Sequence, residues 1–292
     1  MNRTRLHWAL IAGTAAAVGV GAALGTRAVT ELVDSTLPDA RGIASFNRPG
    51  TITLLSSQGK IIQKLGPATR EKIKPGAMPP LVQNAFIAAE DRRFFQHNGV
   101  DVWGIARAVV TNVRQGAVRE GASTITQQLA RIVFLSQDRT ITRKLKEAAL
   151  ALKLERQLSK QQILEQYLNY VYLGSGAYGV SDAAWIYFSK TTDQLTVAEA
   201  ALIAGLPPAP SIYSPLVNPD LARKQRALVL DRMAQSGAIS RVEAERASAS
   251  PLALKPATPK YFNSSAPYFT TWVAQELPKL VTPEQLEVGG IK

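Results

Sequence analysis

An uncharged and largely apolar stretch lies near the beginning of this chain. Residues 8–26 carry no charge, and as a helix they span about 28 Å, close to the hydrocarbon thickness of a bilayer, about 30 Å. We therefore predict a transmembrane anchor at 8–26. Arg3 and Arg5 precede it, so the positive-inside rule places residues 1–7 in the cytoplasm and the rest of the chain outside. The alternative is a cleaved signal peptide, because the stretch is rich in Ala and Gly.

Alternating apolar and polar residues follow the anchor. Residues 27–66 predict a linker in which TITLLSS and KIIQKL flank Gln58-Gly59, the pattern of a β-hairpin. Helical periodicity then dominates a domain at 67–246, with Pro80 well placed to begin its first helix. Three capping boxes precede apolar-periodic stretches, at Thr124–Gln127, Ser159–Gln162 and Thr196–Glu199.

Proline and serine mark the later boundaries. The stretch 206–219 predicts a rigid surface loop because of its prolines, and one more helix follows it. Residues 247–292 predict a linker that begins with a Ser-, Ala- and Pro-rich segment. The fold class is therefore mainly α, with a short β element at each end.

Composition narrows the chemistry. The chain has no cysteine and only two histidines, His7 and His97, which excludes disulfides, thiol nucleophiles, thiolate zinc sites and multi-histidine metal centres. Acid–base chemistry must rest on carboxylates, and any metal must be a hard, oxygen-binding ion. The net charge of +12 favours an anionic partner. Outside a membrane, anionic lipid headgroups or a lipid phosphate fit better than nucleic acid.

Two glutamates are candidates for the chemistry. Glu90 follows Phe86 by one turn on the apolar face of the first helix, where a carboxylate needs a partner or has its pKa raised by desolvation. The alternative is an ion pair with Arg92 or Arg93. Glu147 follows Arg143 by one turn in a strongly basic helix, where a solvated, salt-bridged face is the alternative.

Two glycine-containing segments suggest anion binding. The segment GASTITQQLAR (121–131) begins a capped helix whose first amide groups can hold a phosphate. The segment 174–179 has the GxGxxG spacing of dinucleotide sites, but the run before it is helix-periodic and no βαβ unit surrounds it. We therefore expect no nucleotide site there.

Five segments, taken in order, resemble a known family. They are EDRRFFQHNGVD (90–101), GASTITQQLAR (121–131), RKLKE (143–147), ILEQYLNYVYLGSGAYGV (163–180) and RALVLDRM (226–233). They resemble the five motifs of the family 51 peptidoglycan glycosyltransferases, and the flanking segments resemble the linker of class A penicillin-binding proteins. On this resemblance, 247–292 leads toward an absent transpeptidase domain.

The resemblance implies a lysozyme-like, two-lobed fold with an apolar surface that dips into the membrane. Residues 100–113, which include Trp103 and Arg107, suit that surface, although an ordinary amphipathic core helix is the alternative. It also implies polymerisation of lipid II into β-1,4 glycan strands by inverting transfer, with release of undecaprenyl pyrophosphate. The expected partners are lipid II, the growing glycan, the membrane and proteins of a cell-wall synthesis complex. The expected location is the bacterial plasma membrane, with the catalytic domain on its outer side.

The family's residue roles transfer by position. Glu90 corresponds to the general base on the 4-hydroxyl of the incoming sugar. Glu147 corresponds to the glutamate that helps activate the leaving pyrophosphate. The resemblance implies no tightly bound cofactor, and it allows a divalent cation, Mg²⁺ or Mn²⁺, at the pyrophosphate. The expected substrate-binding residues are Asp91, Phe94, His97, Ser123, Thr124, Gln127, Gln128, Arg131, Arg139, Lys144 and Arg226.

Departures from the family pattern leave both glutamates intact. Ile132 replaces a common Asn, Ser189 a common Gly and Gln225 a common Arg. Two rival functions remain, a hydrolase that cuts glycan and a catalytically inactive membrane-tethered scaffold. A cluster of basic residues around 131–144 argues against the hydrolase, because glycan hydrolysis needs no pyrophosphate site.

Overall fold

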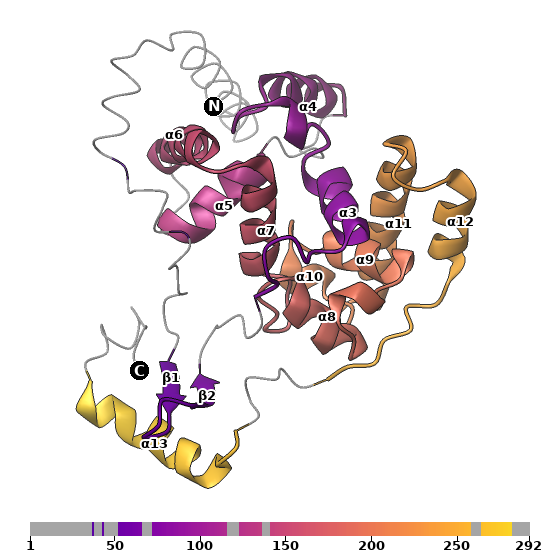
Figure 1. Cartoon of the computed structure of the whole chain (residues 1–292). Helices are drawn as coiled ribbons and strands as arrows, with labels where there is room; N and C mark the ends of the chain where they lie inside the picture. Colours follow the sequence, from indigo (N-terminus) through magenta and orange to yellow (C-terminus); the bar gives the residue numbers. More distant parts are fainter. Residues whose placement is uncertain are drawn as a thin grey trace, which may run out of the picture. The chain divides into compact units, whose positions relative to one another are not determined.

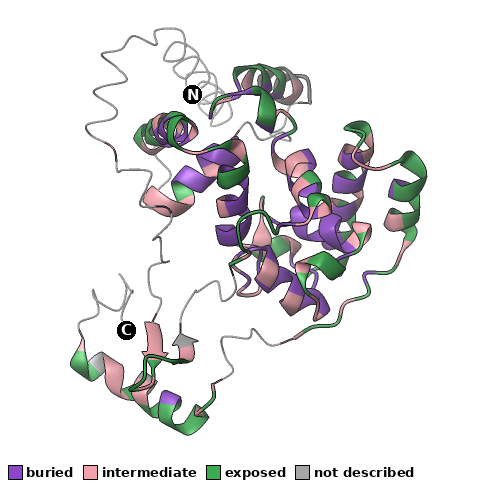
Figure 2. Cartoon of the chain, in the orientation of Figure 1, coloured by how far each residue is buried: buried purple, intermediate pink, exposed green. Residues whose placement is uncertain are grey.

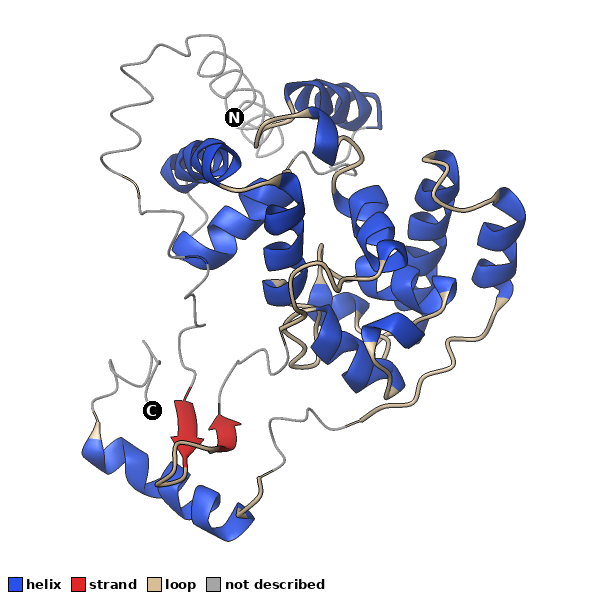
Figure 3. Cartoon of the chain, in the orientation of Figure 1, coloured by secondary structure: helices blue, strands red, loops and turns tan. Residues whose placement is uncertain are grey.

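A computed structural model shows a mainly helical protein, as predicted (Figure 3). It describes Leu37, Ile43 and residues 52–65, 72–115, 123–135, 141–257 and 264–281. The predicted anchor at 8–26 and Arg139 lie outside these residues. Among the helices of the described ranges, none is both long enough and apolar enough to cross a membrane.

The chain divides into two compact units. The first comprises Met1–Ala44 and Glu90–Tyr167, and the second comprises Ser45–Ala89 and Leu168–Lys292. Every residue predicted to act on substrate lies in the first unit, except Arg226. The elements of each unit are labelled in Figure 1.

The first unit is built from short helices around a small apolar core. After the 3-10 turn η2 (Phe94–Gln96) come α4 (Val102–Gln115), α5 (Ile125–Phe134), α6 (Ile141–Gln157) and most of α7 (Lys160–Tyr170). Helix α5 packs against α6. The core consists of fully buried side chains from η2, α5, α6 and α7: Phe94, Ile125, Leu129, Leu150, Leu154, Ile163, Leu164 and Tyr167.

Gly99 lets the loop between η2 and α4 pass close to α6. Its φ of +95° is in the region that favours glycine, and a Cβ there would come within 2.8 Å of the Ala151 backbone. The Gly99 carbonyl accepts a hydrogen bond from Thr124 at the beginning of α5. This loop therefore contacts both the beginning of α5 and the backbone of α6, and there is no room for a side chain at position 99.

The second unit contains the predicted β-hairpin. Strands β1 (Ile52–Leu55) and β2 (Ile61–Leu65) pair antiparallel, with an irregularity in register between Leu54 and Leu55. The turn between them includes Gly59, whose φ of +77° suits a tight hairpin. The hairpin prediction is therefore confirmed.

The second unit contains α9 (Val197–Ala204), whose residues from Glu199 onward are buried. Helix α9 contacts α8, α11 and α12, and buried residues follow α8 and α9 in Figure 2. The remaining elements are α3 (Pro80–Glu90), α8 (Val180–Phe188), η3 (Thr192–Gln194), α10 (Pro210–Tyr213), α11 (Pro219–Gln235), α12 (Arg241–Ala249) and α13 (Pro267–Leu280).

The three predicted capping boxes are present. Thr124 and Gln127 cap α5, and Thr196 and Glu199 cap α9. Ser159 and Gln162 exchange the same pair of hydrogen bonds before α7. Each box satisfies backbone N–H groups that a helix start leaves without partners, so these helix starts are encoded locally.

The prediction for the proline-rich stretch is wrong, and the predicted C-terminal β element is not found among the described residues. Residues 206–219 are not simply a surface loop, because they include α10 and the fully buried Leu206 and Ser214. Pro210 begins α10 because its fixed φ suits the first turn of a helix. The described residues beyond 247 include the end of α12 and all of α13, and contain no strand. Pro267 begins α13 in the same way.

The GxGxxG segment is a packed turn. It joins Tyr172 and Tyr178, which form an antiparallel bridge. A Cβ on Gly174 would come within 2.3 Å of the Pro210 carbonyl oxygen, and one on Gly179 within 2.5 Å of the Asn169 carbonyl oxygen. Positive φ and close backbone approach explain these glycines without a nucleotide.

Candidate active site

Glu90 is the last residue of α3, and its carboxylate has a defined partner. Gln128 Nε2, from α5, donates a hydrogen bond of 2.7 Å to Glu90 Oε2. Gln128 Oε1 in turn accepts a hydrogen bond of 3.1 Å from the hydroxyl of Tyr167 on α7. An ion pair between Glu90 and Arg93, the alternative expected from the sequence, is not formed, because Arg93 pairs with Asp101 at 3.4 Å. Glu90 is half-buried, which suits a base that must be reached by a substrate hydroxyl.

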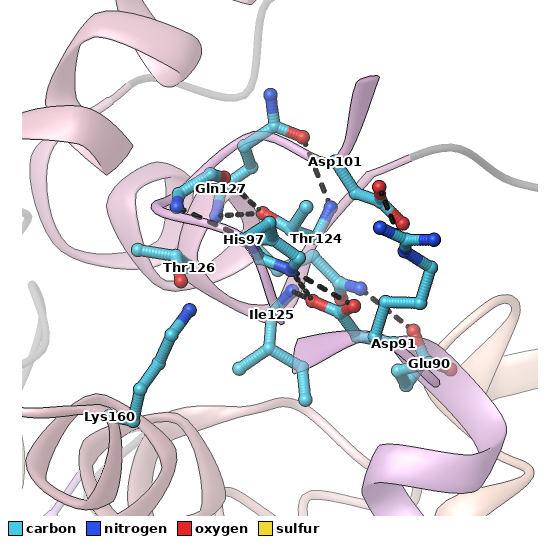
Figure 4. Close-up of polar contacts among 12 residues, drawn as sticks. Glu90, Asp91, His97, Asp101, Thr124, Ile125, Thr126, Gln127 and Lys160 are labelled. Atoms are coloured by element: carbon cyan, nitrogen blue, oxygen red, sulfur yellow. Dashed lines mark hydrogen bonds and ion pairs between the residues drawn. The ribbon is translucent and has the colours of Figure 1, made fainter. Parts of the chain in front are cut away.

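Asp91 and His97 form a buried pair directly after Glu90 (Figure 4). His97 Nδ1 accepts the Gly99 N–H at 3.2 Å, so Nε2 carries the proton and donates to both Asp91 oxygens at 3.0 and 3.1 Å. Asp91 Oδ2 also accepts the N–H of Ile125, in the first turn of α5, at 3.0 Å. The pair therefore links the loop after Glu90 to the beginning of α5 by a hydrogen bond.

Thr124 completes this connection. Its Oγ1 donates to the Gly99 carbonyl at 2.6 Å and accepts the Gln127 N–H at 3.1 Å, while Gln127 Oε1 accepts the Thr124 N–H at 3.0 Å. Thr124 and Gln127 are both 2% exposed. The structure thus uses these two predicted substrate-binding residues to hold the backbone that carries Gln128.

A cluster of cations surrounds Glu147. This carboxylate is 1% exposed and lies on α6. Arg143 pairs with its Oε1, and Lys144 Nζ lies 2.9 Å from its Oε2. Lys144 Nζ also donates to Ser123 Oγ at 2.7 Å. The predicted solvated face is wrong for Glu147, because the carboxylate is buried between two cations.

The positive charge of the cluster affects the pKa of Lys144. Burial lowers its pKa to about 8, and the positive charges of Arg131 and Arg143 contribute to this shift. Arg131 lies in the last turn of α5 and is exposed. Three cations and one carboxylate leave a net positive charge, which suits an incoming polyanion such as a pyrophosphate.

The protein side chains around Glu147 do not by themselves form a divalent metal site. Mg²⁺ is usually held by one or two carboxylates together with substrate phosphates and waters, and Glu147 supplies a single carboxylate. Over the described residues, no group of three or more His, Asp or Glu side chains converges in a way that could hold a metal. Both oxygens of Glu147 face cations, Arg143 and Lys144.

Arg226 belongs to the second unit and has a structural environment there. It is 2% exposed. Its guanidinium donates to the carbonyls of Ser248 at 2.9 Å, Ser250 at 2.7 Å and Pro251 at 3.3 Å. Burial lowers its pKa. Arg226 on α11 therefore fixes the end of α12.

Sequence reasoning missed a second group of buried contacts beside the site. Thr126 Oγ1 donates to Glu155 Oε1 at 2.6 Å, and Lys160 Nζ donates to the same oxygen at 2.7 Å. Lys160 Nζ also lies 4.4 Å from the centre of the Phe94 ring, a cation–π distance. Phe94, predicted to bind substrate, is fully buried in this group. The only available sequence signal was the charge of Lys160 at a helix start.

Helix α4 presents apolar side chains to solvent. Trp103 is 72% exposed and Val102 is 46% exposed, while Arg107 lies on the same helix and is also exposed. A core helix usually buries its tryptophan, so the exposure of Trp103 favours the surface role over an ordinary amphipathic core helix at this end of α4.

Comparison with known proteins agrees with these motifs. A family model described as transglycosylase matches residues 58–234. Penicillin-binding protein 1A of Neisseria lactamica is 46% identical over 241 residues, which are 82% of this chain and 30% of that protein. Penicillin-binding protein 1A of Aquifex aeolicus is 44% identical over 219 residues, 75% of this chain and 30% of that protein.

A solved structure is also similar. The crystal structure of penicillin-binding protein 1A from Haemophilus influenzae aligns with a TM-score of 0.47 and 26% identity, over 84% of this chain and 26% of that one. The chain thus spans less than a third of the length of these relatives. Because the transglycosylase model covers more than half of it, the chain belongs to the transglycosylase family, the peptidoglycan glycosyltransferases whose motifs it carries.

Proposed function

We propose that this chain polymerises lipid II into β-1,4 glycan strands by inverting transfer, with release of undecaprenyl pyrophosphate. One observation carries the proposal: α5 and the residue directly before its N-terminal cap contact both candidate chemical groups. Gln128 donates to Glu90 at 2.7 Å, and Ser123 accepts from Lys144 at 2.7 Å. One short segment, Ser123 to Gln128, therefore contacts both the carboxylate and the net positive cluster.

The reaction assigns a different task to each group. Glu90 removes the proton from the 4-hydroxyl of the incoming sugar while that oxygen attacks the anomeric carbon of the donor. The bond from that carbon to the pyrophosphate breaks, and its electron pair leaves with the pyrophosphate. Attack from the face opposite the leaving group inverts the anomeric centre, as in glycosidases with separate base and leaving-group residues.

The cations stabilise the departing charge. A pyrophosphate already carries negative charge, so it needs cations more than a proton donor. Arg131 and Arg143 supply planar guanidinium groups, which can bind phosphate through two hydrogen bonds. Lys144 supplies a compact charge held by Ser123 and Glu147. Glu147 fixes the two cations that flank it.

The same cluster distinguishes the proposal from glycan hydrolysis. A hydrolase acting on finished glycan has no pyrophosphate to bind, and three cations beside one buried carboxylate would then serve no catalytic purpose. An inactive scaffold is disfavoured because Glu90 and the cations both remain in place.

We place the protein in the bacterial plasma membrane, with its N-terminus cytoplasmic and its catalytic domain outside. The uncharged stretch 8–26 after Arg3 and Arg5 supports this location. The exposed Trp103 and Val102 on α4 suit contact with the headgroup region. Lipid II and the growing glycan are the proposed substrates, and proteins of a cell-wall synthesis complex are proposed partners.

The test uses the full chain in detergent or lipid with labelled lipid II. We expect polymeric glycan that a muramidase digests, and no shortening of preformed glycan offered in parallel. Glu90→Gln keeps the side-chain shape and removes the base, so product formation should fall at least about 10²-fold. Glu245→Gln, at an exposed position on α12, is the matched control and should match the wild type. Cleavage of glycan without polymerisation would show a hydrolase instead.

A further inference from the structure

We infer that Tyr167 is a positioning residue for Glu90, because its hydroxyl fixes the side-chain amide of Gln128 with an N–H directed at the carboxylate. This inference rests on the proposed role of Glu90 as the base. Tyr167 lies in the family motif 163–180, where the resemblance assigns it no role of its own, and it need not touch the substrate.

The three side chains form one continuous hydrogen-bond chain. Tyr167 donates to Gln128 Oε1 over 3.1 Å, and Gln128 Nε2 donates to Glu90 Oε2 over 2.7 Å. They come from α7, α5 and α3, respectively. Tyr167 is fully buried, whereas Gln128 and Glu90 are half-buried. The chain therefore runs from the core of the first unit to the group that meets the substrate.

An amide side chain can present either its oxygen or its nitrogen to a neighbour. If Gln128 turned its amide oxygen toward Glu90, that oxygen and the ionised carboxylate would both be acceptors, and no hydrogen bond could form. This turned orientation would favour the protonated carboxyl group, which can donate to the amide oxygen. The observed orientation favours the ionised form, because a hydrogen bond donated to a carboxylate lowers its pKa.

Tyr167 favours the observed orientation. Burial and the nearby charges of Glu90 and Asp91 keep the pKa of its hydroxyl well above 10, with only a partial opposing effect from Arg131. The phenol therefore remains an O–H donor at every working pH, and Gln128 Oε1 is the acceptor that it uses. A rotated amide would leave this buried donor without its acceptor, which is unfavourable, so rotation of the amide is opposed.

Three other charged groups near Glu90 have partners of their own. Asp91 is bound by His97 and the Ile125 N–H. Arg93 pairs with Asp101, and Arg232 of α11 donates to the Ala89 carbonyl at 2.6 Å. Arg92 follows at an exposed position. Replacing Tyr167 by Phe leaves all of these contacts intact and removes one hydroxyl.

The experiment compares Tyr167→Phe with Tyr187→Phe. Tyr187 is the matched control because it is equally buried, its hydroxyl donates to the Leu173 carbonyl at 2.7 Å, and it belongs to the second unit. We expect Tyr167→Phe to shift the acidic limb of the kcat/KM profile to higher pH. At pH values on the acidic limb, kcat/KM should fall about tenfold. On the plateau it should change less than about threefold, and KM should stay unchanged.

A second measurement does not depend on turnover. Selective 13C labelling of glutamate carboxyls, with Glu90→Gln to assign the signal, follows the titration of Glu90 directly by NMR. Tyr167→Phe should raise the pKa of Glu90, and Tyr187→Phe should leave it unchanged. If wild type does not polymerise lipid II, the proposed function fails, while this titration still tests the positioning role.

A third variant keeps the inference falsifiable if Tyr167→Phe does not fold. Gln128→Leu removes the donor to Glu90 and must raise the same limb and the same pKa. Where both variants fold, Tyr167→Phe should add nothing further to Gln128→Leu, because the tyrosine acts only through the amide. An unchanged titration of Glu90 in Tyr167→Phe or in Gln128→Leu, or an equal shift in Tyr187→Phe, would overturn the inference.

Discussion

Lys144 donates a hydrogen bond of 2.7 Å to Ser123, the residue directly before the cap of α5. This contact holds an ammonium group in a largely buried position beside Arg131 and Arg143. As a result, the pKa of Lys144 is lowered to about 8, and the charge of the proposed pyrophosphate site changes within an experimentally accessible pH range.

We predict that affinity for lipid II falls as pH rises through about 8. Lysine is cationic below its pKa, so the ammonium is present at pH 7 and is lost between about pH 7 and 9. Above the free-enzyme pKa, binding of the anion must first restore the proton, which weakens affinity by up to about tenfold per pH unit. Binding measured from pH 6.5 to 9.5 checks this. Lys144→Arg keeps its charge throughout and should remove the dependence, and a slope that survives in this variant would contradict the assignment.

A second prediction concerns Arg131. It is exposed on α5, so Arg131→Ala should leave the free energy of unfolding within about 0.5 kcal/mol of wild type. Loss of a charge-assisted contact to phosphate should weaken lipid II binding about tenfold or more. Binding and thermal unfolding measured on the same preparation separate the two effects. Arg241→Ala, also exposed but paired with Asp231 on the surface, should leave binding unchanged.

Arg226 is predicted to be structural, against the role that the resemblance gives it. Arg226→Lys keeps the charge but cannot reach the three carbonyls now bound by the guanidinium. We expect a loss of at least about 2 kcal/mol in the free energy of unfolding, because buried acceptors lose their donors. Affinity of the folded variant for lipid II should stay within twofold of wild type. Weakened binding without destabilisation would restore the substrate-binding interpretation.

Thr124 should matter for stability through its single hydroxyl. Thr124→Ala removes the cap of α5 and the donor to the Gly99 carbonyl, so we expect a loss of about 2–3 kcal/mol in denaturant unfolding. Polymerisation should fall with it, because α5 carries Gln128. Thr124→Ser retains the hydroxyl and should lose less than half as much. Equal losses in the two variants would mean that the methyl packing, not the hydrogen bonds, is responsible.

Local signals predicted the helix starts correctly. Thr124, Ser159 and Thr196 each cap the helix that the sequence indicated, because a capping box needs only residues three apart. The apolar stripe before Glu90 was also predictable, and Val82 and Phe86 are indeed buried.

Contacts between distant segments were not predictable from these patterns. The charges near Glu90 suggested a local ion pair, yet Arg93 pairs with Asp101 across a loop. Arginine is a residue type that often binds phosphate, but the partners of Arg226 are backbone carbonyls at the end of α12. A pattern of side chains in the sequence does not reveal such backbone partners. Tyr167 lies in the family motif 163–180, but the motif does not show which group its hydroxyl binds, because that contact forms only between α7 and α5.

The first unit's main stretch begins at Glu90 and ends at Tyr167, and these two residues are joined through Gln128. The hydrogen-bond chain therefore acts as a clasp between the first and the last residue of this segment. Partial opening of either end would withdraw the donor from the carboxylate before the core is lost. Catalytic competence should thus report on the integrity of this segment, and amide hydrogen exchange at the ends of α5 and α7 should change in parallel with activity when the clasp is weakened.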